Sequence, residues 1–105
     1  MISFANVDEL KKWLDSDEKI TLVDCREQSE WDEDHIEQAE FIPLSNFQSL
    51  YADKLKDKDA KIVIQCRSGK RSLQACQMLM QEGYSNLFNL EGGILAWKEN
   101  NYPTI

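Results

Sequence analysis

The sequence predicts an α/β protein built on a mostly parallel β-sheet. Short apolar runs of strand length alternate with longer stretches in which apolar residues recur at helical spacing. The clearest example is the apolar run 62–65, which a tight cationic segment joins to a helix-period stretch that stops at Gly83. Strands that alternate with helices are typical of parallel sheets, in which ligands bind beyond the carboxyl ends of the strands.

The individual elements can be assigned in order along the chain. A helix is predicted over 6–14, because Asn6 can cap it, Glu9 stands three residues later, and apolar residues share one face. A short helix is predicted over 29–34, with Ser29 as its cap. Predicted strands cover 20–24, 41–44, 62–65 and 86–90, and the remaining helices lie near 47–51, after 72 and over 94–100. In the helix after the cationic segment, one face is expected to carry Leu73, Cys76, Leu79 and Met80.

Composition and charge limit the class of protein. With 105 residues, of which 42% are hydrophobic, the chain is expected to form one domain, 1–105, with one modest core. Its net charge of −7, from 19 acidic and 12 basic residues, opposes binding to nucleic acid or to an anionic membrane. No apolar run is long enough to cross a membrane and no signal-peptide pattern is present, so a cytoplasmic protein is expected.

The most informative segment is the loop that follows the strand at 62–65. It reads Cys66-Arg67-Ser68-Gly69-Lys70-Arg71-Ser72. At a strand-to-helix junction, backbone N–H groups and the positive end of the helix dipole favour a cysteine thiolate, which is the nucleophilic form of sulfur. Gly69 permits a left-handed backbone, and successive N–H groups around it can form an anion-binding nest. Ser72 is expected either to cap the helix or to hydrogen-bond within the loop.

These residues together predict a site for a small anion. Cys66 is the expected nucleophile of this site. The substrate is expected to contact the five residues that follow it, Arg67, Ser68, Gly69, Lys70 and Arg71. Three of these five are cations on an otherwise acidic chain, which favours a small anionic substrate.

The three cysteines predict neither a disulfide framework nor a zinc site, because their number is odd and no C-x-x-C pair exists. No metal ion and no cofactor are expected, and a reducing compartment fits best. Cys76 falls on the apolar face of its helix and is expected to be an inert core thiol. Cys25 ends a strand that is expected to neighbour the strand of Cys66. It therefore either packs there or acts as a resolving thiol that forms a disulfide with Cys66.

Other polar and aromatic residues have both a structural and a functional interpretation. Asp24 and Arg26 are expected to form an ion pair or to support the loop rather than to act directly in catalysis. His35, the only histidine, is expected to stabilise a turn through a hydrogen bond rather than to serve as a catalytic base. The acidic stretches 15–18 and 30–34 are expected to form solvated faces or helix-start charges. The core is expected to be anchored by three tryptophans, Trp13, Trp31 and Trp97.

Four ordered motifs run through nearly the whole chain. They are Leu22-Val23-Asp24-Cys25-Arg26-Glu27, then Glu30-Trp31 with His35-Ile36, Ala39 and Ile42-Pro43, then the loop Cys66 to Ser72, and finally Leu90-Glu91-Gly92-Gly93-Ile94 with Ala96-Trp97. In these motifs the chain resembles the rhodanese family of sulfurtransferases. It departs from the family pattern at Asp34 and Gln38, where glycine is usual, and at Cys25, where an apolar residue is usual. Asp34 and Gln38 lie outside the loop, so they bear on local turns rather than on chemistry.

The resemblance implies a rhodanese-like fold, with a mostly parallel five-stranded sheet flanked by helices on both faces. It also implies a sulfurtransferase that works through a Cys66 persulfide. In that mechanism the thiolate attacks the outer sulfur of a donor such as thiosulfate, sulfite leaves, and an acceptor removes the sulfur. The implied partners are a small anionic sulfur donor and cyanide, a thiol or a protein as the acceptor. A persulfide relay module that delivers sulfur to a protein partner remains an open alternative.

Related folds in phosphatases and arsenate reductases use Cys-x5-Arg loops, and the residue count argues against them here. That spacing from Cys66 requires an arginine at position 72, where Ser72 stands, whereas Arg71 gives a loop one residue shorter. A smaller ring of N–H groups suits one sulfur atom better than a tetrahedral oxyanion such as phosphate. A rhodanese-like domain without catalytic activity usually lacks the cysteine, which this chain keeps.

Overall fold

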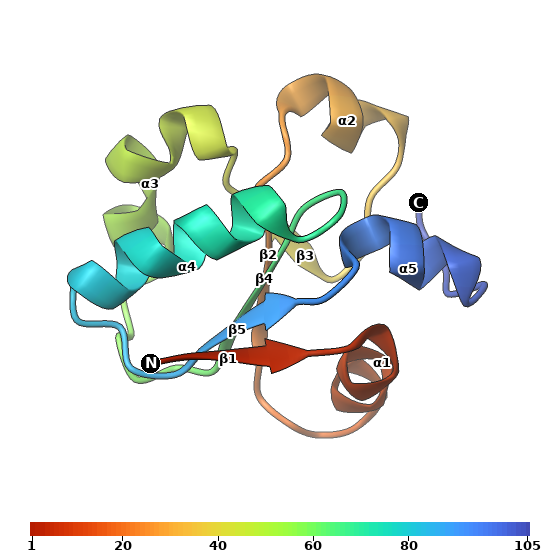
Figure 1. The fold of residues 1–105 in the computed structure, drawn as a ribbon, viewed down its shortest axis with the longest axis horizontal. Helices are drawn as coiled ribbons and strands as arrows, with labels where there is room; N and C mark the ends of the chain where they lie inside the picture. Colours follow the sequence, from red (N-terminus) through yellow and green to blue (C-terminus); the bar gives the residue numbers. More distant parts are fainter.

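The computed structural model describes residues 1–105 and shows one β-sheet with helices on both of its faces (Figure 1). The strands are β1 Ile2–Ala5, β2 Thr21–Asp24, β3 Ala39–Phe41, β4 Ile62–Gln65 and β5 Leu87–Leu90. The α-helices are α1 Val7–Asp15, α2 Gln28–Glu33, α3 Phe47–Lys54, α4 Lys70–Gln81 and α5 Gly93–Glu99, and a 3-10 turn, η1, covers Leu44–Asn46. Strands and helices alternate along the chain, as the sequence predicts.

The sheet is parallel throughout, and its strand order is β1-β5-β4-β2-β3. β4 lies in the centre between β5 and β2, and all four of its residues are buried. Helices α3 and α4 cover one face of the sheet, and α1 and α5 cover the other (Figure 1). The predicted α/β class and the five-stranded sheet between two helical layers are therefore confirmed.

Two apolar cores lie on the two faces of the sheet. The larger core joins Val23 and Ile64 to side chains of α3 and α4, including Phe47 and Leu79. The second core joins Leu22, Val63 and Leu90 to Leu10 of α1 and Trp97 of α5. Successive side chains of a strand point to opposite faces, so one buried strand supplies both cores. The single modest core expected from the composition is thus divided in two by the sheet.

Two strands differ from the sequence prediction. Residues 2–5 form the edge strand β1, which was not predicted; it pairs only with β5 and buries only Ala5. The third strand runs over Ala39–Phe41 rather than over 41–44, because Pro43 leads directly into the turn η1. β1 is only four residues long and lies directly before the cap Asn6, and such a short apolar run is ambiguous between strand and helix by periodicity alone.

The helix termini show one confirmed cap and one error. At the start of α1, Asn6 accepts a hydrogen bond from the Glu9 N–H at 2.8 Å, and the Glu9 carboxylate accepts from the Asn6 N–H at 3.0 Å, which is the predicted capping box. Helix α2 instead begins at Gln28, one residue before the predicted cap, Ser29. There the Glu30 carboxylate accepts from the N–H of the preceding cap residue at 3.0 Å.

The buried face of α4 also differs from the prediction. Cys76 and Leu79 are completely buried, but Met80 is 40% exposed. Leu79 and Met80 are consecutive, so about 100° of helix rotation separates them, and the sheet covers only one of the two. The small residues Ser72 and Ala75 complete the buried face.

Of the three tryptophans, only Trp97 is buried as predicted. Trp13 and Trp31 are partly buried. Trp13 packs edge-on against Phe88, with ring centroids 5.3 Å apart, and Trp31 stacks on His35 at 3.6 Å. None of the helices is long and apolar enough to cross a membrane.

Candidate active site

Cys66 lies at the carboxyl end of β4, in the short loop that leads to α4. β4 pairs with both β2 and β5, so the carboxyl ends of three strands meet at this edge of the sheet. Cys66 itself is only 1% exposed, whereas Arg67 and Ser68 are exposed. The sulfur is therefore buried within a loop of which Arg67, Ser68 and Lys70 face solvent.

Two groups face the sulfur of Cys66. The Gly69 N–H donates to Sγ at 3.1 Å, and Ser72 Oγ lies 3.4 Å from Sγ. Gly69 has a φ of 111° and caps α4, so glycine provides the left-handed backbone that turns its N–H toward the sulfur. Ser72 lies inside α4 and contacts the loop sulfur, which confirms the second of the two roles predicted for it.

These contacts change the acidity of the thiol. Burial opposes ionisation, but the favourable effect of the Ser72 hydroxyl and of the backbone N–H groups at the start of α4 on an anionic sulfur outweighs it. The pKa of Cys66 therefore lies below its ordinary value. A lower pKa increases the fraction of nucleophilic thiolate near neutral pH. The arrangement can thus support attack of sulfur on an electrophilic atom and can hold an anionic sulfur afterwards.

Hydrogen bonds from α5 and β5 hold three carbonyl groups of the loop. The Ile94 N–H donates to the Cys66 carbonyl at 2.9 Å, and the Leu95 N–H donates to the Arg67 carbonyl at 3.2 Å. The side-chain Nδ2 of Asn89 donates to the Gly69 carbonyl at 3.0 Å. In a planar trans peptide the C=O and N–H point in opposite directions, so a carbonyl held on one side turns the next N–H to the other. The first turn of α5 and Asn89 therefore keep the N–H groups of the loop in place.

Gly93 makes this close approach of α5 possible. A Cβ atom at Gly93 would lie 2.4 Å from the carbonyl oxygens of both Cys66 and Arg67. The residue also has a φ of 55°, in the left-handed region. Only glycine combines this backbone conformation with such close contact.

The three cations of the loop have different surroundings. Arg71 forms a bidentate ion pair with Glu30 of α2, with N–O distances of 2.7 and 2.9 Å. The hydrogen bonds from Arg71 hold the pKa of Glu30 near 2, well below its ordinary value. Arg67 and Lys70 are exposed and form no ion pair. Arg67 and Lys70 are thus the cations left to attract an anion, while Arg71 ties the loop to α2.

The sequence profile described as "Rhodanese-like domain" matches residues 6–100. The chain belongs to the rhodanese family. A sulfurtransferase of Allochromatium vinosum is 37% identical over 105 residues, which are 100% of this chain and 96% of that protein. The thiosulfate sulfurtransferase GlpE of Coxiella burnetii is 28% identical over 102 residues, which are 96% of this chain and 92% of the relative.

Further comparisons support the rhodanese fold and sulfur transfer in general. The crystal structure of a rhodanese-related protein from Thermoplasma volcanium superposes with a TM-score of 0.84 at 30% identity, covering 98% of this chain and 97% of that one. The probable adenylyltransferase/sulfurtransferase MoeZ of Mycobacterium tuberculosis is 38% identical over 95 residues. This chain spans 24% of the length of MoeZ, and the match covers 90% of this chain.

Asp24, Arg26 and His35 form the ion pair and the hydrogen bond that the sequence predicts for them. Arg26 and Asp24 form a buried ion pair with a 3.0 Å N–O distance, and Arg26 also donates to the Asp34 carbonyl at 2.7 Å. Nδ1 of His35 lies 2.9 Å from the Trp31 carbonyl, a contact within the turn that follows α2. These contacts show the structural interactions of the three residues, and the absence of a direct role in catalysis stays a prediction.

The stretch 30–34 agrees in part with the prediction, because Glu30 lies in the first turn of α2 and Asp32 and Glu33 are exposed, but two of its carboxylates also form ion pairs. Glu30 pairs with Arg71, and Asp34 pairs with Lys98 at 2.9 Å. The hydrogen bond from Lys98 lowers the pKa of Asp34 below its ordinary value. These two carboxylates therefore tie α2 and its end to α4 and α5, a function that local sequence cannot indicate because both partners are distant in the chain.

The other two cysteines are poor nucleophiles in this rhodanese fold. All three cysteines are free thiols. Burial raises the pKa of Cys76 to about 12, which agrees with the predicted inert core thiol. Burial, together with the neighbouring Cys66 and Asp24, raises the pKa of Cys25 far above its ordinary value. The Cys25 N–H donates to the Gln65 carbonyl at 2.9 Å, so Cys25 directly follows β2 beside the end of β4. A resolving role for Cys25 stays a prediction.

Sequence reasoning missed Asn89 altogether. It is 4% exposed, lies on β5, and contacts both Gly69 and Ser72. One signal was available, because Asn89 is a polar residue in the otherwise apolar run of β5 just before the strand ends. Interpreting that signal requires the neighbouring position of β4 and β5, which only the fold provides.

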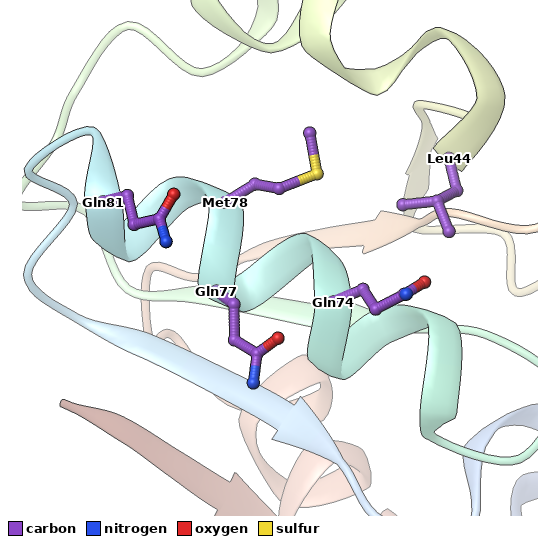
Figure 2. A pocket seen from close by; sticks show the side chains of 5 residues that line it. All are labelled: Leu44, Gln74, Gln77, Met78 and Gln81. Atoms are coloured by element: carbon purple, nitrogen blue, oxygen red, sulfur yellow. The ribbon is translucent and has the colours of Figure 1, made fainter.

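The hollows of the surface lie away from the loop. One of about 340 Å³ runs along the outer side of α4 and is lined by Leu44, Gln74, Gln77, Met78 and Gln81 (Figure 2). No residue from 66 to 71 lines this hollow or any other. No group of three or more His, Cys, Asp or Glu side chains is arranged to hold a metal ion. None of these hollows therefore opens onto Cys66, and the residues exposed around it are Arg67, Ser68 and Lys70.

Proposed function

We propose that this chain is a sulfurtransferase that carries sulfane sulfur as a Cys66 persulfide and accepts it from a small anionic donor such as thiosulfate. The observation that carries the proposal is the environment of the sulfur. The Gly69 N–H and Ser72 Oγ lie at Sγ, and the pKa of Cys66 is lowered. Arg67 and Lys70 add unpaired positive charge beside it. The similarity to a thiosulfate sulfurtransferase supports the choice of donor.

The reaction is a pair of sulfur displacements. The Cys66 thiolate attacks the outer sulfur of thiosulfate, a new S–S bond forms, and the S–S bond of thiosulfate breaks. Sulfite leaves with the electron pair, and the terminal persulfide sulfur is held by the N–H groups of the loop. A nucleophilic acceptor, such as cyanide or a thiolate, then attacks that terminal sulfur and returns Cys66 as a thiolate. Because the loop lowers the pKa of Cys66, the proposed reaction includes no separate general base.

Intact-mass measurement after thiosulfate treatment tests this proposal. We expect the parent to gain one sulfur, about 32 Da, which cyanide removes. Cys66→Ser should lose both this mass gain and thiosulfate:cyanide transfer, with an unchanged circular dichroism spectrum. Cys25→Val is the matched control and should keep both, because Cys25 is a buried thiol with a raised pKa. A mass gain on Cys66→Ser, or transfer that survives in it, contradicts the assignment.

A persulfide relay to a protein acceptor is the second candidate, and one feature favours it. No enclosed hollow covers the loop, so Arg67, Ser68 and Lys70 are open to a macromolecular partner. If the loop serves mainly as a relay, a persulfidated chain should pass sulfur to a protein thiol much faster than to cyanide at equal concentration. If it serves mainly small molecules, the two rates should be comparable.

Phosphatase chemistry is disfavoured by the loop. Arg71, the only arginine near the spacing used by Cys-x5-Arg loops, directs its guanidinium to Glu30. We therefore expect no turnover of aryl phosphates above the level of Cys66→Ser. Robust turnover by the parent would reverse this ranking of functions.

A further inference from the structure

One buried side chain contacts both residues whose polar groups face the sulfur of Cys66: the carbonyl of Gly69 and the hydroxyl of Ser72. Asn89 donates through Nδ2 to the carbonyl of Gly69 at 3.0 Å, and its Oδ1 accepts from the hydroxyl of Ser72. Asn89 and Ser72 are 4% and 0% exposed, respectively. The chain Asn89–Ser72–Cys66 is therefore shielded from bulk water, and each proton in it has few alternative acceptors.

The direction of these hydrogen bonds follows from the chemistry of the groups. The Gly69 carbonyl can only accept, so the amide of Asn89 must turn Nδ2 toward it. Oδ1 then faces Ser72, and the single hydroxyl proton of Ser72 is donated to Asn89. A lone pair of Ser72 Oγ is left to face Cys66 Sγ at 3.4 Å, where it can accept the thiol proton. This arrangement fits a neutral thiol.

When Cys66 is a thiolate, its sulfur needs a hydrogen-bond donor at this contact instead of an acceptor. An anionic sulfur can only accept, and hydrogen bonds to ionised groups are stronger than those between neutral groups. Ser72 has one proton and can give it either to Cys66 or to Asn89, but not to both. If the proton moves to the sulfur, Oδ1 of Asn89 becomes a buried acceptor without a donor, which is unfavourable. Thiolate formation is therefore opposed by Asn89 at the same site where Ser72 favours it.

We propose that Asn89 is a positioning residue that controls the hydroxyl proton of Ser72, which rests on Asn89 while Cys66 is a thiol and rotates onto the sulfur when Cys66 becomes anionic. The thiol proton leaves to solvent, and the hydroxyl proton changes acceptor by rotation about the Cβ–Oγ bond, so no bond to carbon or sulfur breaks. Asn89 thereby limits the resting thiolate population, while its Nδ2 keeps the Gly69 carbonyl in place. This inference deepens the proposed function, since it takes Cys66 as the reactive thiol.

The test measures the pKa of Cys66 in four proteins: the parent, Asn89→Leu, Ser72→Ala and the double variant. The rate of alkylation by iodoacetamide is followed against pH by intact mass, and it needs no sulfur donor. Leucine has a similar size and cannot accept, so Asn89→Leu should free Ser72 to donate to the thiolate. We expect the pKa of Cys66 to fall by about one pH unit, equivalent to ~1.4 kcal/mol. In the Ser72→Ala background the same substitution should leave the pKa unchanged or raise it, because no hydroxyl proton is available.

A role confined to loop structure gives a different pattern. If Asn89 only holds Gly69, its loss should turn N–H groups away from the sulfur and raise the pKa of Cys66 in both backgrounds. A rise in the pKa of Cys66 in both the parent and the Ser72→Ala background, or an equal fall in both, overturns the proposal. If the parent protein shows no thiosulfate turnover but the pKa of Cys66 follows the expected pattern in the four proteins, the proposed function is wrong and the role of Asn89 stands.

A second measurement covers the case in which the variants do not fold. In the parent, the side-chain carbonyl carbon of Asn89 should titrate by NMR with the same midpoint as Cys66 alkylation, because Oδ1 loses its donor as the thiolate forms. In Cys66→Ser this titration should disappear. A carbonyl resonance that does not change through the midpoint in the parent overturns the proposal.

Discussion

The substitution Gly93→Ala tests whether α5 holds the Cys66 loop in its working shape. Gly93 lies against the backbone of Cys66 and Arg67, and a Cβ at this position would come within 2.4 Å of both carbonyl oxygens. That is 1.0 Å closer than the 3.4 Å at which ordinary contact begins. The loop or the first turn of α5 must therefore move by a comparable distance.

The size of the effect can be worked out from a matched glycine. Gly83 also has a left-handed backbone, with a φ of 90°, but a Cβ there meets only the flexible end of Lys58 at 3.9 Å. Gly83→Ala should therefore show the backbone strain alone, about 1–2 kcal/mol of unfolding free energy. Gly93→Ala adds a steric clash, so its total loss should be about 2–5 kcal/mol.

Gly93→Ala and Gly83→Ala should differ more in their rates of sulfur transfer than in their stability. Displacement of α5 weakens the bonds from Ile94 to the Cys66 carbonyl and from Leu95 to the Arg67 carbonyl. The N–H groups of the loop then turn away from the sulfur, and the pKa of Cys66 should rise. A misplacement of about 1 Å can lower a rate by roughly 100-fold, which is the loss we expect for sulfur transfer by Gly93→Ala.

Three measurements check this expectation. Urea unfolding gives the stability of both variants, iodoacetamide alkylation gives the pKa of Cys66, and thiosulfate:cyanide transfer is normalised to the folded fraction. Gly83→Ala should keep the parental pKa and transfer rate. If Gly93→Ala behaves like Gly83→Ala in all three, the reasoning about α5 is refuted.

Further outcomes follow from the charges and buried polar groups around the site. Glu30→Gln should lower stability by about 1 kcal/mol at pH 7, because the pair with Arg71 is partly exposed. The folded-state pKa of Glu30 is depressed from 4.5 to about 2, so the parent's advantage should be complete above pH 4.5 and disappear as pH falls toward 2; a difference independent of pH in urea unfolding would contradict this. Arg67→Ala and Lys70→Ala should each raise the apparent KM for thiosulfate by roughly twofold to fivefold at low salt, and the effect should fade at high salt; parental KM values throughout would exclude electrostatic capture. Gln65 is completely buried and neither terminal atom has a protein partner, so Gln65→Leu should raise the free energy of unfolding by about 1–2 kcal/mol, and a loss measured by urea unfolding would show that its amide is satisfied.

The class of fold and the reactive loop could be predicted from local patterns in the amino-acid sequence. Alternating strand-length and helix-period segments predict a parallel α/β sheet, because each periodicity reflects a local burial pattern. The Gly69 backbone, the cap at Asn6 and the spacing of Cys66 to Arg71 are likewise local features. They were predicted correctly because φ angles, caps and loop lengths depend on residues close in the chain.

Contacts between segments that are distant in the chain could not be predicted in this way, because they depend on how the elements pack. The pairing of Arg71 with Glu30, the contact of Gly93 with the Cys66 carbonyl and the position of Asn89 between Gly69 and Ser72 each join residues from different elements. The same holds for β1, which becomes a strand only because β5 offers an edge to pair with. A polar side chain such as Asn89 has the same local propensity whatever it contacts. Its role depends on which strands are neighbours, and strand order is a property of the whole fold rather than of any segment.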